Sequence, residues 1–163
     1  DFTKIQSPPD DGKTFKDNAK IKSLFGFRKY KGVCFADDSG ICIEALNGGP
    51  AVESKTYLKL HKTSSVVFKN IISTARKLNN FKAFFQTTIC LTVNEKKHFY
   101  FDGKINGRIS EEIKGVDGFG YDPIFIPQGQ KLTFAEMSVE NKNLLSHRSI
   151  AVKKLESYLS KLV

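Results

Sequence analysis

The sequence predicts an α/β domain in which helices pack on the faces of a mixed β-sheet. Segments with a helical spacing of apolar residues alternate with segments rich in β-branched and aromatic residues. Two of the strand-like segments flank the polar sequence NEKK, which is typical of a hairpin, so the sheet is not purely parallel. A chain of 163 residues is long enough to bury its own core as a single domain, with at most two lobes.

The first expected helix follows a polar lead that contains two prolines. Thr14 and Asp17 have the spacing of a capping box, and apolar positions continue on one face to about residue 28. A buried strand over 32–36 comes next, then a turn at Asp37-Asp38, then a second strand over 41–46. The later elements are a helix capped by Ser64 or Ser65, strands over 82–93 and 98–102, an apolar segment over 123–126 and a helix capped by Ser146.

Composition narrows the class of protein. The net charge of +9 suggests a nucleic-acid partner, but the 26 Lys and Arg residues are spread along the whole chain, so a solvated basic surface is the simpler interpretation. No apolar run approaches the ~20 residues of a membrane span. The three cysteines lack metal-ligand or disulfide spacing, which favours reduced thiols in a cytoplasmic protein.

Asp37 and Asp38 form the first candidate site. Adjacent residues of a strand point to opposite faces, so one carboxylate is expected to face a cleft and the other to support it. Carboxylates at a strand end suit Mg²⁺, which takes one or two protein carboxylates together with waters and phosphates. The alternative is a structural Asp-Ser-Gly turn.

Two further segments contain candidate ligand-binding residues. In Gly115–Pro123, the glycines permit close approach of the backbone to a ligand, and Phe119 and Tyr121 offer faces for stacking on a base, unless both rings belong to the core. In the segment that ends at Arg148, His147 and Arg148 fall in the first turn of a helix. A cation is unfavourable there, so Arg148 is expected to serve something other than the helix.

Together these segments resemble the inosine triphosphate pyrophosphatase family, whose members hydrolyse non-standard purine nucleoside triphosphates such as ITP, dITP and XTP. The resemblance rests on TFKDNA (14–19), ADDSG with IEALNGGP (36–50), GFGYDPIF (118–125) and TFAEMS with KNLLSHR (133–148). It covers most of the chain. It implies a three-layer α/β/α fold with a mixed sheet, two lobes around a cleft, and a homodimer.

The resemblance also implies roles for individual residues. Asp38 corresponds to the catalytic carboxylate and metal ligand, Asp37 to its companion, and Asp10 stands where the family has a metal-binding Glu. The implied reaction is Mg²⁺-dependent attack of water on the α-phosphorus, which releases pyrophosphate and a nucleoside monophosphate. The implied substrate-binding residues are Ser39, Phe119, Gly120, Tyr121, Asp122, Lys142, His147 and Arg148, of which Lys142, His147 and Arg148 read the 6-keto edge of the purine.

Two departures from the family pattern bear on this expectation. The family begins with a strand and a phosphate-gripping loop, whereas this chain reaches TFKDNA within 14 residues, so residues 1–163 are expected to be a single, N-terminally incomplete domain. In PAVESKTY (50–57), Ala51 and Thr56 stand where the family has Gly and Arg.

Three functions remain open from the sequence. The leading hypothesis is a pyrophosphatase for deaminated purine nucleotides. The second is a catalytically impaired nucleotide- or nucleic-acid-binding relative on the same scaffold, although a nucleic-acid partner is not favoured. The third, a related pyrophosphatase for modified pyrimidines, is disfavoured by the segment from Lys142 to Arg148.

Overall fold

The computed structural model describes residues 8–162 of the chain. The expectation of a missing segment upstream of Asp10 falls mainly outside this range. The elements, in chain order, are α1 (Phe15–Tyr30), β1 (Cys34–Ile43), α2 (Ser54–Leu58), α3 (Ser64–Lys77), β2 (Lys82–Asn94), β3 (Lys97–Ile109), β4 (Phe125–Pro127), α4 (Val139–Leu145) and α5 (His147–Leu159), with 3₁₀ turns at Glu44–Leu46, Ala51–Glu53 and Asp122–Ile124.

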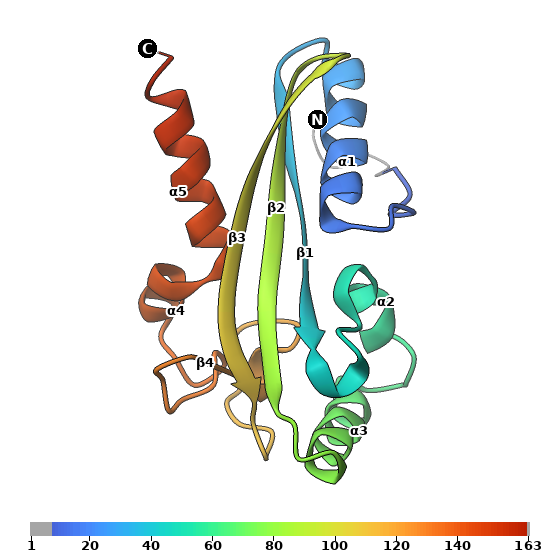
Figure 1. Ribbon diagram of the computed structural model, residues 1–163, viewed down its shortest axis with the longest axis vertical. Helices are drawn as coiled ribbons and strands as arrows, with labels where there is room; N and C mark the ends of the chain where they lie inside the picture. Colours follow the sequence, from blue (N-terminus) through green and yellow to red (C-terminus); the bar gives the residue numbers. More distant parts are fainter. Residues whose placement is uncertain (1–7, 163) are drawn as a thin grey trace.

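The four strands of the described residues form one sheet in the order β1-β2-β3-β4. The α/β class is confirmed, but the mixed sheet is wrong for these residues, because every pair of neighbouring strands is antiparallel. The reason lies in the helical connection between β1 and β2. Ile43 ends β1 and pairs with Ala83 near the start of β2, so the chain re-enters the sheet where it left it, and α3 lies at that end (Figure 1). A parallel strand needs a crossover that returns along the sheet.

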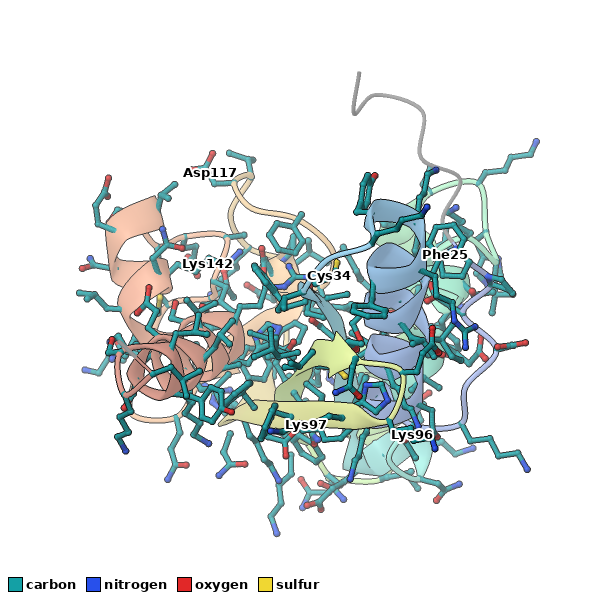
Figure 2. All side chains as sticks on the ribbon, turned by 90° about the horizontal axis from the view of Figure 1, so that it is seen from above. Phe25, Cys34, Lys96, Lys97, Asp117 and Lys142 are labelled. Carbon is teal, nitrogen blue, oxygen red and sulfur yellow. The ribbon has the colours of Figure 1, made fainter. Side chains whose placement is uncertain are left out.

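Helices cover both faces of the long β2–β3 hairpin, which gives the expected three layers. Alternate residues of β2 face opposite ways. Thr92 faces α1, where its hydroxyl lies 2.7 Å from that of Ser23. Ile89 and Leu91 face α5 and form a hydrophobic cluster with Ala151 and Leu155. The view from above shows α1 on one side of the strands and the C-terminal helices on the other (Figure 2).

A second and larger hydrophobic cluster fills the opposite end of the hairpin. It packs α3 and the 121–137 region against the ends of β1 and β2, with Ile41, Phe85 and Phe125 among its members. Two clusters at the two ends of one hairpin agree with the expected two lobes.

The carboxylate turn expected at Asp37-Asp38 is wrong. β1 runs without interruption from Cys34 to Ile43, and both aspartates pair with β2 in its middle, Asp37 with Ile89 and Asp38 with Thr88. The strand tolerates two adjacent acids because each carboxylate has a cationic partner from a different helix, as described below.

Helix caps follow the sequence closely at two of three expected positions. Thr14 and Asp17 form the reciprocal capping box of α1, and the Ser146 hydroxyl accepts a hydrogen bond from the backbone of Ser149 at the start of α5. The cap of α3 is instead Thr63, without a side-chain bond. Within residues 8–162, no helix combines the length and apolar character needed to cross a membrane.

Candidate active site

A cavity of about 840 Å³ runs along β1, which is the first strand of the described sheet. Its walls come from α1 and α2 on one side, and from the loop that holds Phe119 and the helices α4 and α5 on the other. The cavity therefore reaches both faces of one strand. Side chains that alternate along β1 can contribute to it from opposite sides.

Asp38 points toward α1. It is 9% exposed, and its carboxylate accepts hydrogen bonds from the Asn18 amide at 3.2 Å and from the Lys22 ammonium at 2.6 Å. Lys22 also binds the Asp10 carboxylate at 2.9 Å. Two carboxylates from distant parts of the sequence therefore converge on one ammonium group.

The two partners of this ion pair respond to it differently. Burial raises the pKa of Asp38 above its ordinary value, and Lys22 and Asn18 offset only part of that rise. Burial alone would lower the pKa of Lys22, but Asp38 and Asp10 together outweigh it and raise that pKa. Desolvation dominates at the more deeply buried carboxyl, whereas pairing dominates at the lysine, which has two partners.

Asp37 points to the opposite face. Its Oδ2 accepts hydrogen bonds from the Ser39 hydroxyl at 2.8 Å and from Arg148 Nε at 3.2 Å. Ser39 Oγ also lies 2.8 Å from the hydroxyl of Thr87 on β2. The two acids face opposite ways, as expected for adjacent strand residues, but both line the cavity, so the expectation that only one of them faces a cleft is wrong.

The glycine-rich loop is organised around Asp122. Gly118 and Gly120 have positive φ angles of 82° and 63°, and a side chain on Gly118 would collide with the Asp122 carboxylate. That buried carboxylate accepts a hydrogen bond from the backbone N–H of Phe119 at 2.7 Å and binds the Lys142 ammonium of α4. Asp122 thus fixes both the loop and a cation at the cavity wall.

The two aromatic residues of this loop have different roles. The Phe119 ring is 62% exposed, with Lys142 Nζ 4.3 Å and the Arg148 guanidinium carbon 5.4 Å from its centroid. Tyr121 is 3% exposed, and its hydroxyl donates a hydrogen bond to the Ser54 carbonyl at 2.8 Å. Burial raises the Tyr121 pKa. The expectation that Tyr121 offers a face to a base is therefore wrong, since its ring belongs to the core.

His147 begins α5 and is buried at the floor of the cavity. Its ring stacks on Phe85, with centroids 4.9 Å apart and planes 7° from parallel, and its buried Nδ1 has no hydrogen-bond partner among residues 8–162. Burial, aided by Arg148, lowers the His147 pKa to about 4. The helix start sits this deep because Gly103 of β3 lies against the His147 carbonyl, where a side chain would collide.

All the residues expected to act as catalytic, metal-binding, supporting or substrate-binding groups line this one cavity. They are Asp10, Asp37, Asp38, Ser39, Phe119, Gly120, Tyr121, Asp122, Lys142, His147 and Arg148.

The sequence interpretation missed other lining residues. Lys22 had a detectable signal, because it is a charged residue within the apolar face of α1. Lys55 of α2 lines the cavity, whereas Thr56, which stands at the family's Arg, does not. Ala51, at the family's Gly, has the positive φ of 50° that such a glycine accommodates.

Asp10 and Asp38 are the residues that fit a divalent cation. The described residues contain no cluster of three or more His, Cys, Asp or Glu side chains with the geometry of a metal site. Two convergent carboxylates are nevertheless a sufficient protein contribution for Mg²⁺, which commonly completes its shell with waters and substrate phosphates. The buried Asp38 carboxylate in particular gains from a nearby cation.

Comparisons with known proteins agree with this geometry. The Ham1 family model matches residues 1–158. A dITP/XTP pyrophosphatase of Porphyromonas gingivalis is 41% identical over 152 residues, which cover 93% of this chain and 78% of that protein. Another from Christiangramia forsetii is 39% identical over 150 residues, with coverages of 92% and 78%.

Solved structures give the same result. A Ham1 protein from Coxiella burnetii superposes with a TM-score of 0.89 at 32% identity, covering 96% of this chain and 82% of that one. A nucleoside-triphosphatase, or dITP/XTP pyrophosphatase, from Mycobacterium abscessus has a TM-score of 0.77 at 32% identity, with coverages of 93% and 79%.

Proposed function

The chain belongs to the Ham1 family, and we propose that it is a pyrophosphatase that hydrolyses non-standard purine nucleoside triphosphates such as ITP, dITP and XTP. One observation carries this proposal. A single strand, β1, presents Asp38 with Lys22 toward one side of the cavity and Asp37 with Arg148 toward the other. The names of the curated relatives, dITP/XTP pyrophosphatase, support the same activity.

The side of the cavity next to Phe119 suits a purine with a 6-keto group. Lys142 and Arg148 are cationic donors there, and His147, whose lowered pKa keeps the ring neutral near pH 7, can donate from one nitrogen only. A keto oxygen satisfies such donors, whereas the 6-amino group of adenine leaves them unpaired. Unpaired donors in a site built for a hydrogen bond discriminate strongly against the wrong substrate.

The side of the cavity next to α1 suits the triphosphate. Lys22 and Lys55 supply positive charge, and Asp10 and Asp38 would hold Mg²⁺. When bound, that ion neutralises phosphate charge and lowers the pKa of a coordinated water.

We assign the proton transfer to Asp38. Water adds to the α-phosphorus, the bond between this phosphorus and the bridging oxygen to the β-phosphorus breaks, and pyrophosphate leaves with the electron pair. Asp38 Oδ1 or Oδ2 accepts the proton of the water. A carboxylate whose pKa is raised by burial is a stronger base than an exposed one, and Lys22 keeps it oriented. A homodimer and a cytoplasmic location remain part of the proposal.

The substitution Asp38→Asn tests this assignment. The variant keeps the size of the side chain and is expected to lose about 10²- to 10⁴-fold in ITP turnover with Mg²⁺. Asp102→Asn is the matched control, because Asp102 lies on the same face of the sheet, outside the cavity. Circular dichroism checks that both variants fold. Near-normal turnover by Asp38→Asn would refute the role of Asp38, and a folded wild-type chain that binds ITP without hydrolysing it would favour the impaired relative.

A further inference from the structure

Arg148 is held in place by Asp37 and not by its own helix. It lies in the first turn of α5, where the helix dipole disfavours a cation. Its Nε donates a hydrogen bond to Asp37 Oδ2 at 3.2 Å, and no other ion pair involves Arg148 among residues 8–162. The orientation of the guanidinium group therefore depends on a carboxylate 111 residues away in the sequence.

Asp37 is itself anchored to the buried sheet. Ser39 Oγ donates to Asp37 Oδ2 at 2.8 Å, and Thr87 Oγ1 approaches the same oxygen at 3.5 Å. Thr87 is completely buried and also donates to the Asp38 carbonyl at 3.1 Å. These hydroxyls hold the Asp37 carboxylate at one position on the strand, and the carboxylate in turn orients the Arg148 guanidinium group.

Two cations therefore approach Phe119, each tied by its own carboxylate. Lys142 is tied to Asp122, and both side chains are largely buried. Arg148 is tied to Asp37, and both side chains are close to half exposed. The first pair also holds the loop, so losing it would disturb the fold. The second pair meets that loop only where the Arg148 guanidinium group faces the Phe119 ring, and it makes no hydrogen bond to the loop among residues 8–162, so its loss would affect mainly the direction of the guanidinium group.

The geometry points to Asp37 as a positioning residue that sets the purine selectivity of the site through Arg148, and not as a participant in the chemistry. This inference rests on the proposed function. The Asp37 side chain lies on the face of β1 opposite to Asp38, and its carboxylate bonds to Ser39 and Arg148 and not to Lys22, Asn18 or Asp10 among residues 8–162. Only the backbone carbonyl of Asp37 meets that cluster, where it accepts a hydrogen bond from Lys22 Nζ at 3.4 Å. With the carboxylate present, Arg148 keeps its donors directed at the base. Without it, the guanidinium group can turn away, and a 6-amino group no longer meets a fixed donor.

The test compares ITP with ATP in the variant Asp37→Asn. The amide keeps the size of the side chain and can still accept the Ser39 hydrogen bond, but it loses the charge that holds Arg148. Exposed ion pairs are worth at most about 1 kcal/mol, so the ratio of kcat/KM for ITP over ATP is expected to fall by about three- to five-fold, with the loss for ITP appearing in KM. Glu95→Gln is the matched control, since it breaks an exposed pair with Arg28 far from the cavity, and its ratio is expected to match that of the wild type.

A second variant separates positioning from a general structural effect. In an Arg148→Ala background, Asp37→Asn should change the ITP-to-ATP ratio no further, because the residue through which it acts is gone. An unchanged ratio in Asp37→Asn alone, or a further fall in the double variant, would overturn the inference. So would an equal loss of kcat for both nucleotides, which would place Asp37 in the chemistry.

Binding measurements keep this inference separate from the proposed function. Calorimetry gives the dissociation constants for ITP and ATP in an Asp38→Asn background. When Asp37→Asn is added, the preference for ITP over ATP in these constants should fall by the same factor as the kinetic ratio. A folded wild-type chain that prefers ITP in binding but never converts it to IMP would end the proposed function. In that case, a weaker binding preference for ITP over ATP in the Asp37→Asn variant would still support the role of Asp37. An unchanged binding preference would still refute that role.

Discussion

His147 makes the stability of the fold depend on pH in a predictable direction. The ring is 8% exposed, and burial and Arg148 lower its pKa to about 4 from the ordinary value of 6.5. Between these two values the unfolded chain binds a proton that the folded chain does not. The contribution of His147 to stability is therefore complete above about pH 6.5 and is lost as the pH falls toward 4.

The size of this effect follows from the two pKa values. Between pH 7.5 and pH 5.0, His147 is expected to remove roughly 2 kcal/mol from the free energy of unfolding. Replacement by Phe keeps a ring on Phe85 and removes the titratable group and its unpaired Nδ1. The variant His147→Phe should therefore lose about 2 kcal/mol less than the wild type over the same pH interval.

Urea unfolding at pH 7.5 and pH 5.0 measures this difference. The chain has no tryptophan, so far-ultraviolet circular dichroism is the suitable signal. The control is His61→Gln, which removes a histidine from an exposed position and is expected to follow the wild type. Equal pH-dependent losses in the wild type and in His147→Phe would refute the reasoning, because they would show that the buried ring does not oppose protonation.

Three further variants test the packing that supports the cavity. Tyr121→Phe removes the hydrogen bond to the buried Ser54 carbonyl and should cost about 1 to 2 kcal/mol in urea unfolding, and an unchanged stability would contradict the core role of that hydroxyl. Gly103→Ala places a methyl group against the His147 carbonyl and should cost about 1 to 3 kcal/mol, whereas a neutral change would mean that the start of α5 is loosely seated. Ala51→Gly relieves a residue at a φ of 50° and should raise the free energy of unfolding by up to about 1 kcal/mol after the entropy of glycine is subtracted, and a lower free energy of unfolding in urea would contradict strain at that position.

Local signals in the sequence predicted the elements that depend on local contacts. The capping box of α1, the start of α5 and the β2–β3 hairpin all rest on residues close together in the chain. Whether two neighbouring strands run parallel or antiparallel depends on the end of the sheet at which the connection between them returns. For β1 and β2 that connection is residues 44–81, and its local sequence pattern does not show at which end it returns. The mixed sheet was expected because helices and strands alternate and one hairpin is present, but alternation does not distinguish a connection that crosses a face of the sheet from one that returns at the same end.

The candidate site residues come from separate sequence motifs and lie in one cavity, but the sequence did not predict the individual environment of each side chain. Adjacent acids in the middle of a strand look like a turn until their partners are known, and Lys22 and Arg148 approach them from helices far away in the sequence. Phe119 and Tyr121 look equivalent in the sequence. Only the packing of the loop exposes one ring and buries the other.

The most direct test of the central claim is a competition between two nucleotides in one reaction. The wild-type chain is incubated with equal concentrations of ITP and ATP and with Mg²⁺, and the products are resolved by ion exchange. The account predicts IMP and pyrophosphate, with ATP left largely intact. AMP formed at a comparable rate would contradict the proposed selectivity, and IDP with inorganic phosphate would show that the chain cuts a different bond.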